Sequence, residues 1–245
     1  MNAPFPEWID LGERVTMQKI KNLLLRILPG YGWRCLLTLT ALQLLVFDGT
    51  RIPLRFMERV DLSTPLDLLI PFRPEWIVIY VLSFLSWGVT FLILFRQEKE
   101  QVYRNSAAYF LTLLLTGAMF LLLPGTLVRP PVVGDDVFSR LTRLVYAADP
   151  PDNLCPSLHV ICSYYCWRGL FGAKAPKWYK GFNFVFLLLV CCSILFVKQH
   201  VITDIPVAIL ISEGTLQLCR QMSTSWLSKL PGYAKMEEKN GRNHS

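Results

Sequence analysis

Two long apolar blocks without a charged side chain constrain this chain more than any other feature. One runs from Trp76 to Phe95 and has 20 residues, and the other runs from Asn105 to Val128 and has 24. Because an α-helix rises about 1.5 Å per residue, either block as a helix crosses a bilayer core about 30 Å thick. Only 18% of the 245 residues are charged, and the mean hydropathy is +0.38. These values exclude a water-soluble enzyme, a disordered chain and a small disulfide-stapled domain.

The apolar runs predict an all-α fold, a polytopic membrane helical bundle with six transmembrane helices in one domain, residues 33–219. Transmembrane strands are disfavoured because the runs lack the alternating pattern of a barrel. The predicted spans cover residues 33–47, 76–95, 105–123, 156–171, 180–197 and 200–219. Glu213 falls inside the last span, where a polar contact to another span is the default expectation.

The flanking segments and the charge distribution predict the orientation. Residues 1–32 form a cytoplasmic segment in which positions 7–28 have the makeup of an interfacial amphipathic helix, with a cytoplasmic helix free of lipid as the alternative. Residues 220–245 form a cytoplasmic tail, disordered at its end. With both termini cytoplasmic, most of the 25 Lys and Arg residues lie inside, as the positive-inside rule expects. They form no stripe for nucleic acid, so we expect a multi-pass protein of a bacterial inner membrane or an endomembrane.

The segment from Lys198 to Asp204 carries the strongest chemical signal. His200 and Asp204 are four residues apart, so on a helix they share one face. A carboxylate there accepts a hydrogen bond from Nδ1 of the imidazole and leaves Nε2 free as a nucleophile or base. The alternative is that the His–Asp pair only caps the end of a helix or packs against its neighbours, without a chemical role.

Two further segments fall at the same predicted outer face. Pro156-Ser157-Leu158-His159 reads as the start of a helix, where free backbone N–H groups and the Ser157 hydroxyl suit phosphate oxygens. Arg129, followed by two prolines, suits bidentate phosphate binding, although an interfacial arginine is the simpler interpretation on its own. The competing interpretation is that the two histidines and the aspartate bind zinc. The nearby Arg129 and Lys198 attract an anion and repel a cation, which favours phosphate chemistry.

Between about Pro124 and Pro206 the chain resembles the type 2 phosphatidic acid phosphatase superfamily of integral membrane lipid phosphatases and phosphotransferases. Arg129-Pro130 matches the end of that family's first motif, and Pro156-Ser157 with His159 matches the second. Ser193, His200 and Asp204 match the third. Three positions depart from the pattern: Leu122 replaces a lysine, Leu158 a glycine and Ile194 an arginine. The Pro-Ser-Leu-His and Lys-Gln-His forms are more similar to the branch with inositol phosphorylceramide synthases.

The resemblance implies a role for each matched residue. His200 is the expected nucleophile, which forms a phosphohistidine, Asp204 orients it, and His159 is the general acid and later the base. Arg129, Lys198, Ser157 and Ser193 are expected to hold the phosphoryl oxygens. No metal or other cofactor is implied, and the site is expected to be extracytoplasmic or lumenal.

Three functions remain open at this stage. The first is a metal-independent phosphatase acting on a phosphatidic acid-like or isoprenoid phosphate, with a lipid phosphate substrate and the bilayer as partners. The second is a lipid phosphotransferase, similar to inositol phosphorylceramide synthases, that uses a lipid hydroxyl as acceptor. The third is a non-catalytic membrane protein that binds a phospholipid.

Overall fold

A computed structural model of the chain describes residues 18–19 and 22–222. Most of the predicted cytoplasmic segment 1–32, including the first part of the expected amphipathic helix, lies outside the described residues. The same holds for the predicted tail from residue 223 onward.

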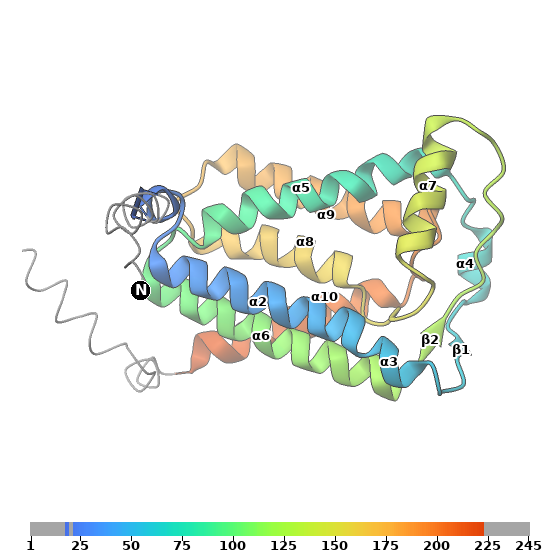
Figure 1. Cartoon of the computed structure of the whole chain (residues 1–245), viewed down its shortest axis with the longest axis horizontal. Helices are drawn as coiled ribbons and strands as arrows, with labels where there is room; N and C mark the ends of the chain where they lie inside the picture. The colour runs from blue at the N-terminus through green and yellow to red at the C-terminus, as the bar shows by residue number, and fades with distance from the viewer. Residues whose placement is uncertain (1–17, 20–21, 223–245) are drawn as a thin grey trace, which may run out of the picture.

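Four long helices run along the bundle (Figure 1). They are α2 (Gly30–Gly49), α5 (Ile77–Leu94), α6 (Lys99–Leu122) and α9 (Lys177–Phe196). Each belongs to a segment long and apolar enough to cross a membrane, and in the described part of the chain there are four such segments. Their exposed faces carry large apolar side chains such as Leu45, Leu85 and Val185, which suit contact with lipid. The all-α membrane bundle is therefore supported, with four candidate spans where the sequence predicts six.

The remaining two predicted spans correspond to α8 (Leu158–Gly169) and α10 (Asp204–Gln221). Helix α8 has 12 residues and is therefore about 18 Å long, too short to cross the hydrocarbon core alone. It packs against α5, α9 and α10, and all of its residues except Trp167 and Arg168 are buried. Helix α10 begins at Asp204, four residues after the predicted start at His200.

Polar contacts join α8 and α10 inside the bundle. The Glu213 carboxylate accepts hydrogen bonds from the Arg168 guanidinium at 3.0 Å and from the Tyr164 hydroxyl at 2.7 Å. Deeper in the bundle, the hydroxyl groups of Thr112, Tyr165 and Thr215 lie within 2.9 Å of one another. A buried hydroxyl needs such a partner because its unpaired burial costs about 1–3 kcal/mol.

One end of the bundle is closed by short elements. The strands β1 (Val60–Asp61) and β2 (Gly125–Thr126) pair in parallel, beside the short helices α3 (Arg51–Leu54) and α4 (Pro65–Leu69). Helix α7 (Val137–Ala148) lies across the ends of the long helices (Figure 1). Two single 3-10 turns, η1 (Pro74–Trp76) and η2 (Leu170–Gly172), flank α5 and α8. The predicted site residues gather beneath this cap.

Candidate functional site

A turn at the C-terminal end of α9 directs the chain into the site. The N–H of Gln199 donates to the carbonyl of Ile194 at 2.8 Å, and the N–H of Lys198 donates to that of Leu195 at 3.2 Å. This pair of bonds is the Schellman motif, which needs a left-handed residue directly after the helix cap. Lys198 takes that conformation with φ of 50°, although glycine is the residue that adopts it without strain. The motif reverses the chain so that Gln199 and His200 are buried beneath the cap.

His200 and Asp204 form the pair that the sequence predicts, but not along a helix face. The imidazole Nδ1–H donates to Oδ2 of Asp204 at 2.9 Å, and the same oxygen accepts from the N–H of Val201 at 3.1 Å. The Asp204 side chain is fully buried. Because Nδ1 is occupied, Nε2 is the ring nitrogen left to react.

His159 lies in the first turn of α8. Ser157 caps this helix, since its side-chain oxygen accepts from the N–H of Val160 at 3.4 Å. Tyr80 and Trp87 pack on the His159 ring, with centroids 4.4 and 5.4 Å away. Both ring nitrogens of His159 are buried and have no hydrogen-bond partner among the described residues. A buried polar group in this state calls for a ligand or a water.

The two histidines line one cavity. Their ring centroids are 5.6 Å apart with an interplanar angle of 64°, so the rings meet edge to face. The cavity has an empty volume of about 280 Å³. Its lining residues come from five separate parts of the chain and are Phe47, Arg129, Asp149, Pro150, Asp152, Asn153, Leu158, His159, Gln199 and His200. A phosphoryl group entering here would lie beside the ring pair, because rings in contact leave no room between them.

Arg129 is fixed by the segments around the cavity. Its Nη1 donates to the carbonyl of Asp149 at 2.7 Å, its Nε to the carbonyl of Lys198 at 3.3 Å, and its Nη2 to Oε1 of Gln199. The guanidinium also lies over the ring of Tyr146, 4.4 Å from the centroid. Burial lowers the pKa of Arg129, and the nearby Asp149 opposes that shift. The three bonds leave two of its five N–H groups for an anion.

The other three predicted phosphate ligands have protein partners. Ser193 is fully buried and donates to the carbonyl of Trp76 at 2.9 Å. The Lys198 ammonium donates to the carbonyl of Asp67 at 2.7 Å. Burial lowers the pKa of Lys198, and the charge of Asp67 opposes this. Ser157 caps α8. The structure therefore brings together His159, His200, Asp204 and Arg129, whereas Ser157, Ser193 and Lys198 are not among the residues that line the cavity.

A network of charges that the sequence did not reveal borders the cavity. Arg51 donates to Asp149 at 2.9 Å and to Asp152 at 2.8 Å, while Arg59 lies 3.5 Å from Asp152. The Tyr80 hydroxyl donates to the second Asp149 oxygen at 3.0 Å. Both carboxylates are thus neutralised by arginines from the 51–59 segment. The only signal for this in the sequence is the presence of Asp and Arg in the predicted outer loops.

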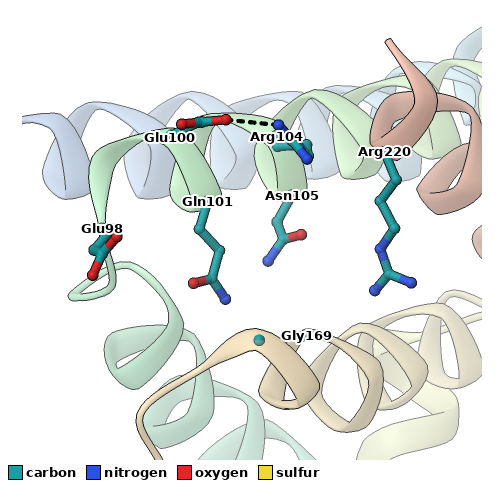
Figure 2. Close-up of a pocket in the computed structure, with 8 residues that line it drawn as sticks. Glu98, Glu100, Gln101, Arg104, Asn105, Gly169 and Arg220 are labelled. Carbon is teal, nitrogen blue, oxygen red and sulfur yellow. Dashed lines mark hydrogen bonds and ion pairs between the residues drawn. The ribbon is translucent and has the colours of Figure 1, made fainter. Parts of the chain in front are cut away.

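A larger polar cavity lies at the opposite end of the bundle. It has an empty volume of about 820 Å³ and is bordered by Glu98, Gln101, Arg104 and Arg220 (Figure 2). Arg104 is paired with Glu100 at 2.7 Å. None of the predicted catalytic residues lines this cavity, so it is separate from the histidine site.

Comparison with known proteins gives no relative for this chain. No protein-family model, no curated protein and no solved structure matches it. Within residues 18–19 and 22–222, no group of three or more His, Cys, Asp or Glu side chains is placed to hold one metal ion. The fold and the site define an α-helical protein with four helices that can span a membrane and with a cavity at one end of the bundle that two histidines and an arginine line.

Proposed function

We propose that this protein transfers the phosphoryl group of a membrane lipid phosphate through a phosphohistidine on His200, with water as the final acceptor. The observation that carries the proposal is the common cavity of His159, His200 and Arg129, with Asp204 bonded behind His200. An imidazole held by a carboxylate at Nδ1 is a nucleophile at Nε2, and a guanidinium suits an anion.

In the first step, Nε2 of His200 forms a bond to phosphorus while the bond from phosphorus to the lipid oxygen breaks. His159 in its protonated form donates a proton to that oxygen, and the lipid alcohol leaves. In the second step, His159 removes a proton from water, the new hydroxide oxygen bonds to phosphorus, and the P–N bond breaks. Asp204 stabilises the positive charge that develops on His200. Arg129 stabilises the charge on the phosphoryl oxygens.

The unpartnered nitrogens of His159 support this assignment. An oxygen of the bound phosphate supplies the partner that the described residues do not. The amide nitrogen of Gln199 is also buried without a partner, and its side-chain oxygen is the acceptor for Arg129. A phosphate in the cavity would satisfy donors from three segments at once.

A lipid phosphotransferase is the second candidate, and the apolar side of the cavity favours it. Phe47 and Leu158 line the cavity beside the histidines. This surface suits a lipid whose hydroxyl replaces water in the second step. Both reactions share the phosphohistidine, so analysis of the products with candidate acceptors present separates them. A non-catalytic phospholipid-binding protein is the third candidate.

The proposed topology has six spans, with both termini in the cytoplasm and the site on the extracytoplasmic or lumenal side. In this arrangement α8 lies inside the bundle against α5, α9 and α10, and α10 packs on α6 and α8. The burial of α8 on all sides supports this role. The basic segment after α8, which carries Lys174 and, in the first turn of α9, Lys177 and Lys180, then faces the cytoplasm.

The function is tested by measuring phosphate release from a lipid phosphate by the detergent-solubilised protein in EDTA. We expect release by the wild type and by His244→Ala, which changes the third histidine of the chain, and at least a thousandfold loss in His200→Ala. Equal release by His200→Ala and the wild type would show that His200 is not the nucleophile. Loss of wild-type activity in EDTA would favour a metal-dependent reaction, and binding of the lipid without any turnover would favour the non-catalytic candidate.

A further inference from the structure

An apolar groove lies between α2 and α5, on the side of the bundle where no other helix separates them. Figure 1 shows α8 behind the space between these two helices. The groove consists of two adjoining cavities that share Gln43, Leu44, Phe84 and Trp87, and the larger has an empty volume of about 1180 Å³. Leu44 and Phe84 are more than half exposed, so the groove opens toward the surface that lipid would cover.

The groove is continuous with the histidine cavity. His159, Phe47, Leu158 and Asp149 line both the upper part of the groove and the cavity that holds His200. From there the lining descends along α2 as far as Leu36 and along α5 as far as Leu92. Phe47 and Leu36 are eleven residues apart, which corresponds to about 16 Å along the helix. This is about half the thickness of the hydrocarbon core, the depth of one leaflet.

The polar side chain of Gln43 interrupts the mostly apolar lining near its upper end. The Gln43 Oε1 atom accepts a hydrogen bond from the Tyr109 hydroxyl at 2.6 Å and one from the Cys162 thiol at 3.7 Å. This fixes the amide so that its Nε2 is free to donate into the groove, since no hydrogen bond from that atom occurs among the described residues. Gln43 is one turn along α2 from Phe47, and Cys162 is one turn along α8 from His159. The donor therefore lies one helical turn, about 5 Å, from the level of the histidines.

We infer that the groove binds a hydrocarbon chain of the lipid phosphate and that Gln43 selects a lipid with a hydrogen-bond acceptor close to its phosphate, as in a glycerol ester. This inference rests on the proposed function. An ester carbonyl of a diacylglycerol phosphate lies a few bonds from phosphorus and reaches the Gln43 amide when the phosphate is at His200. An isoprenoid phosphate has only hydrocarbon at that distance and leaves the amide unpaired. A site with an unpaired buried donor disfavours such a ligand.

Gly88 offers a direct way to block the groove. It lines the groove on α5, and a Cβ atom added there meets nothing within 4 Å. The variant Gly88→Phe fills the space that the chain would occupy, whereas Gly88→Ala adds one methyl group and favours the helix. We expect Gly88→Phe to lower kcat/KM for dioleoyl phosphatidate at least tenfold and to leave p-nitrophenyl phosphate, which has no chain, within twofold of wild type. Gly88→Ala should match the wild type on both.

The selectivity is tested with Gln43→Leu. We expect the ratio of kcat/KM for dioleoyl phosphatidate over farnesyl phosphate to fall about tenfold, the effect of one neutral hydrogen bond. Thr40→Val is the matched control, because it removes a polar group from the same groove but leaves the Gln43 donor and its bond to Tyr109. Its ratio should stay within twofold of wild type. An unchanged ratio in Gln43→Leu would overturn the role of Gln43.

A binding measurement separates the failure of this inference from the failure of the proposed function. Dioleoyl phosphatidate bound to the solubilised protein is counted by native mass spectrometry in Gly88→Ala and Gly88→Phe. If the wild type turns over no substrate, and Gly88→Phe loses the bound lipid while Gly88→Ala keeps it, the proposed reaction is wrong but the chain-binding groove is supported. If both variants bind the lipid equally, the groove assignment fails, whatever the activity.

Discussion

Arg129 donates through its Nε to the backbone carbonyl of Lys198, 69 residues further along the chain. This bond ties the loop after β2 to the turn that carries His200. The same guanidinium also bonds Asp149 and Gln199, so one side chain positions three segments of the cavity wall. The arrangement depends on a planar group with several donors, which lysine does not have.

We therefore expect Arg129→Lys to lower kcat/KM for a lipid phosphate about a hundredfold, the cost of one positioned oxyanion donor. The charge remains, but the fork that joins Asp149, Lys198 and Gln199 is lost. Steady-state phosphate release measures the effect. Arg143→Lys is the control, because Arg143 bonds Asp135 and the carbonyls of Val132 and Gly134 on the exposed side of α7. Equal loss in both variants would show a general effect of removing guanidinium groups.

Asp204→Asn is expected to reduce kcat about a thousandfold or more while the fold is retained. The amide still fits beside His200, but it has no negative charge to stabilise the imidazolium, and its NH2 group competes for the position that holds the reactive tautomer. Rapid-quench measurement of the phosphohistidine checks the step affected. The control is Asp136→Asn at the N-cap of α7, where asparagine caps as well as aspartate. Wild-type phosphohistidine formation in Asp204→Asn would contradict the assigned role.

The strained backbone at Lys198 gives a stability prediction. Both Lys198→Gly and Lys198→Ala remove the ammonium bond to Asp67, but only glycine relieves the left-handed conformation at φ of 50°. The free energy of unfolding of the glycine variant should exceed that of the alanine variant by about 1 kcal/mol. Titration with SDS measures the difference. Equal stability of the two variants would show that the turn is unstrained.

Cys155 should resist alkylation in the folded protein. Burial, followed by the charge of Asp204, raises the pKa of this thiol to about 12. Since the thiolate is the reactive form, iodoacetamide should leave Cys155 unmodified between pH 7 and 10, well below that pKa. Mass spectrometry of the native and the SDS-unfolded protein over this range gives the comparison. Modification of Cys155 at the same rate in both states would exclude the raised pKa.

Arg51 is expected to stabilise the cap over the cavity. It bonds both Asp149 and Asp152, and its side chain is only 15% exposed. In Arg51→Met the buried Asp152 carboxylate loses its closest partner, which should lower the free energy of unfolding by about 3 kcal/mol. The double variant Arg51→Met with Asp152→Asn should recover part of this loss. Thermal unfolding in detergent measures both, and no recovery in the double variant would show that the Arg51–Asp152 pair is not the cause.

The sequence predicts much of this site because its signals are local. The spacing of His200 and Asp204 predicts their contact, and the contact forms, although a turn replaces the expected helix. The turn depends on Lys198, a residue type that rarely takes the left-handed conformation, so the pattern gave no indication of it. Spacing also cannot tell which way Ser193 and Lys198 point, and both bond backbone carbonyls outside the cavity.

Long-range contacts explain the features that the sequence did not predict. Arg51 and Asp152 are 101 residues apart, and nothing in the sequence joins them. The number of spanning helices is a similar case, because apolar composition does not separate a lipid-facing helix from one buried inside protein. Helix α8 is apolar because it is buried inside the protein, where α5, α9 and α10 surround it.

In the proposed six-span topology, the shortness of α8 also sets how far below the membrane surface the reaction would take place. The helix ends at Gly169, which borders the cavity with Glu98 and Arg220, and its other end reaches only about 18 Å back toward the cap. If Gly169 lies at one interface of a core about 30 Å thick, as the proposed topology implies, the histidines lie roughly 10 Å beneath the opposite interface. A charged head group must shed most of its hydration before any bond changes. Turnover should consequently be faster in bilayers of short-chain lipids, whose interface lies nearer to that depth.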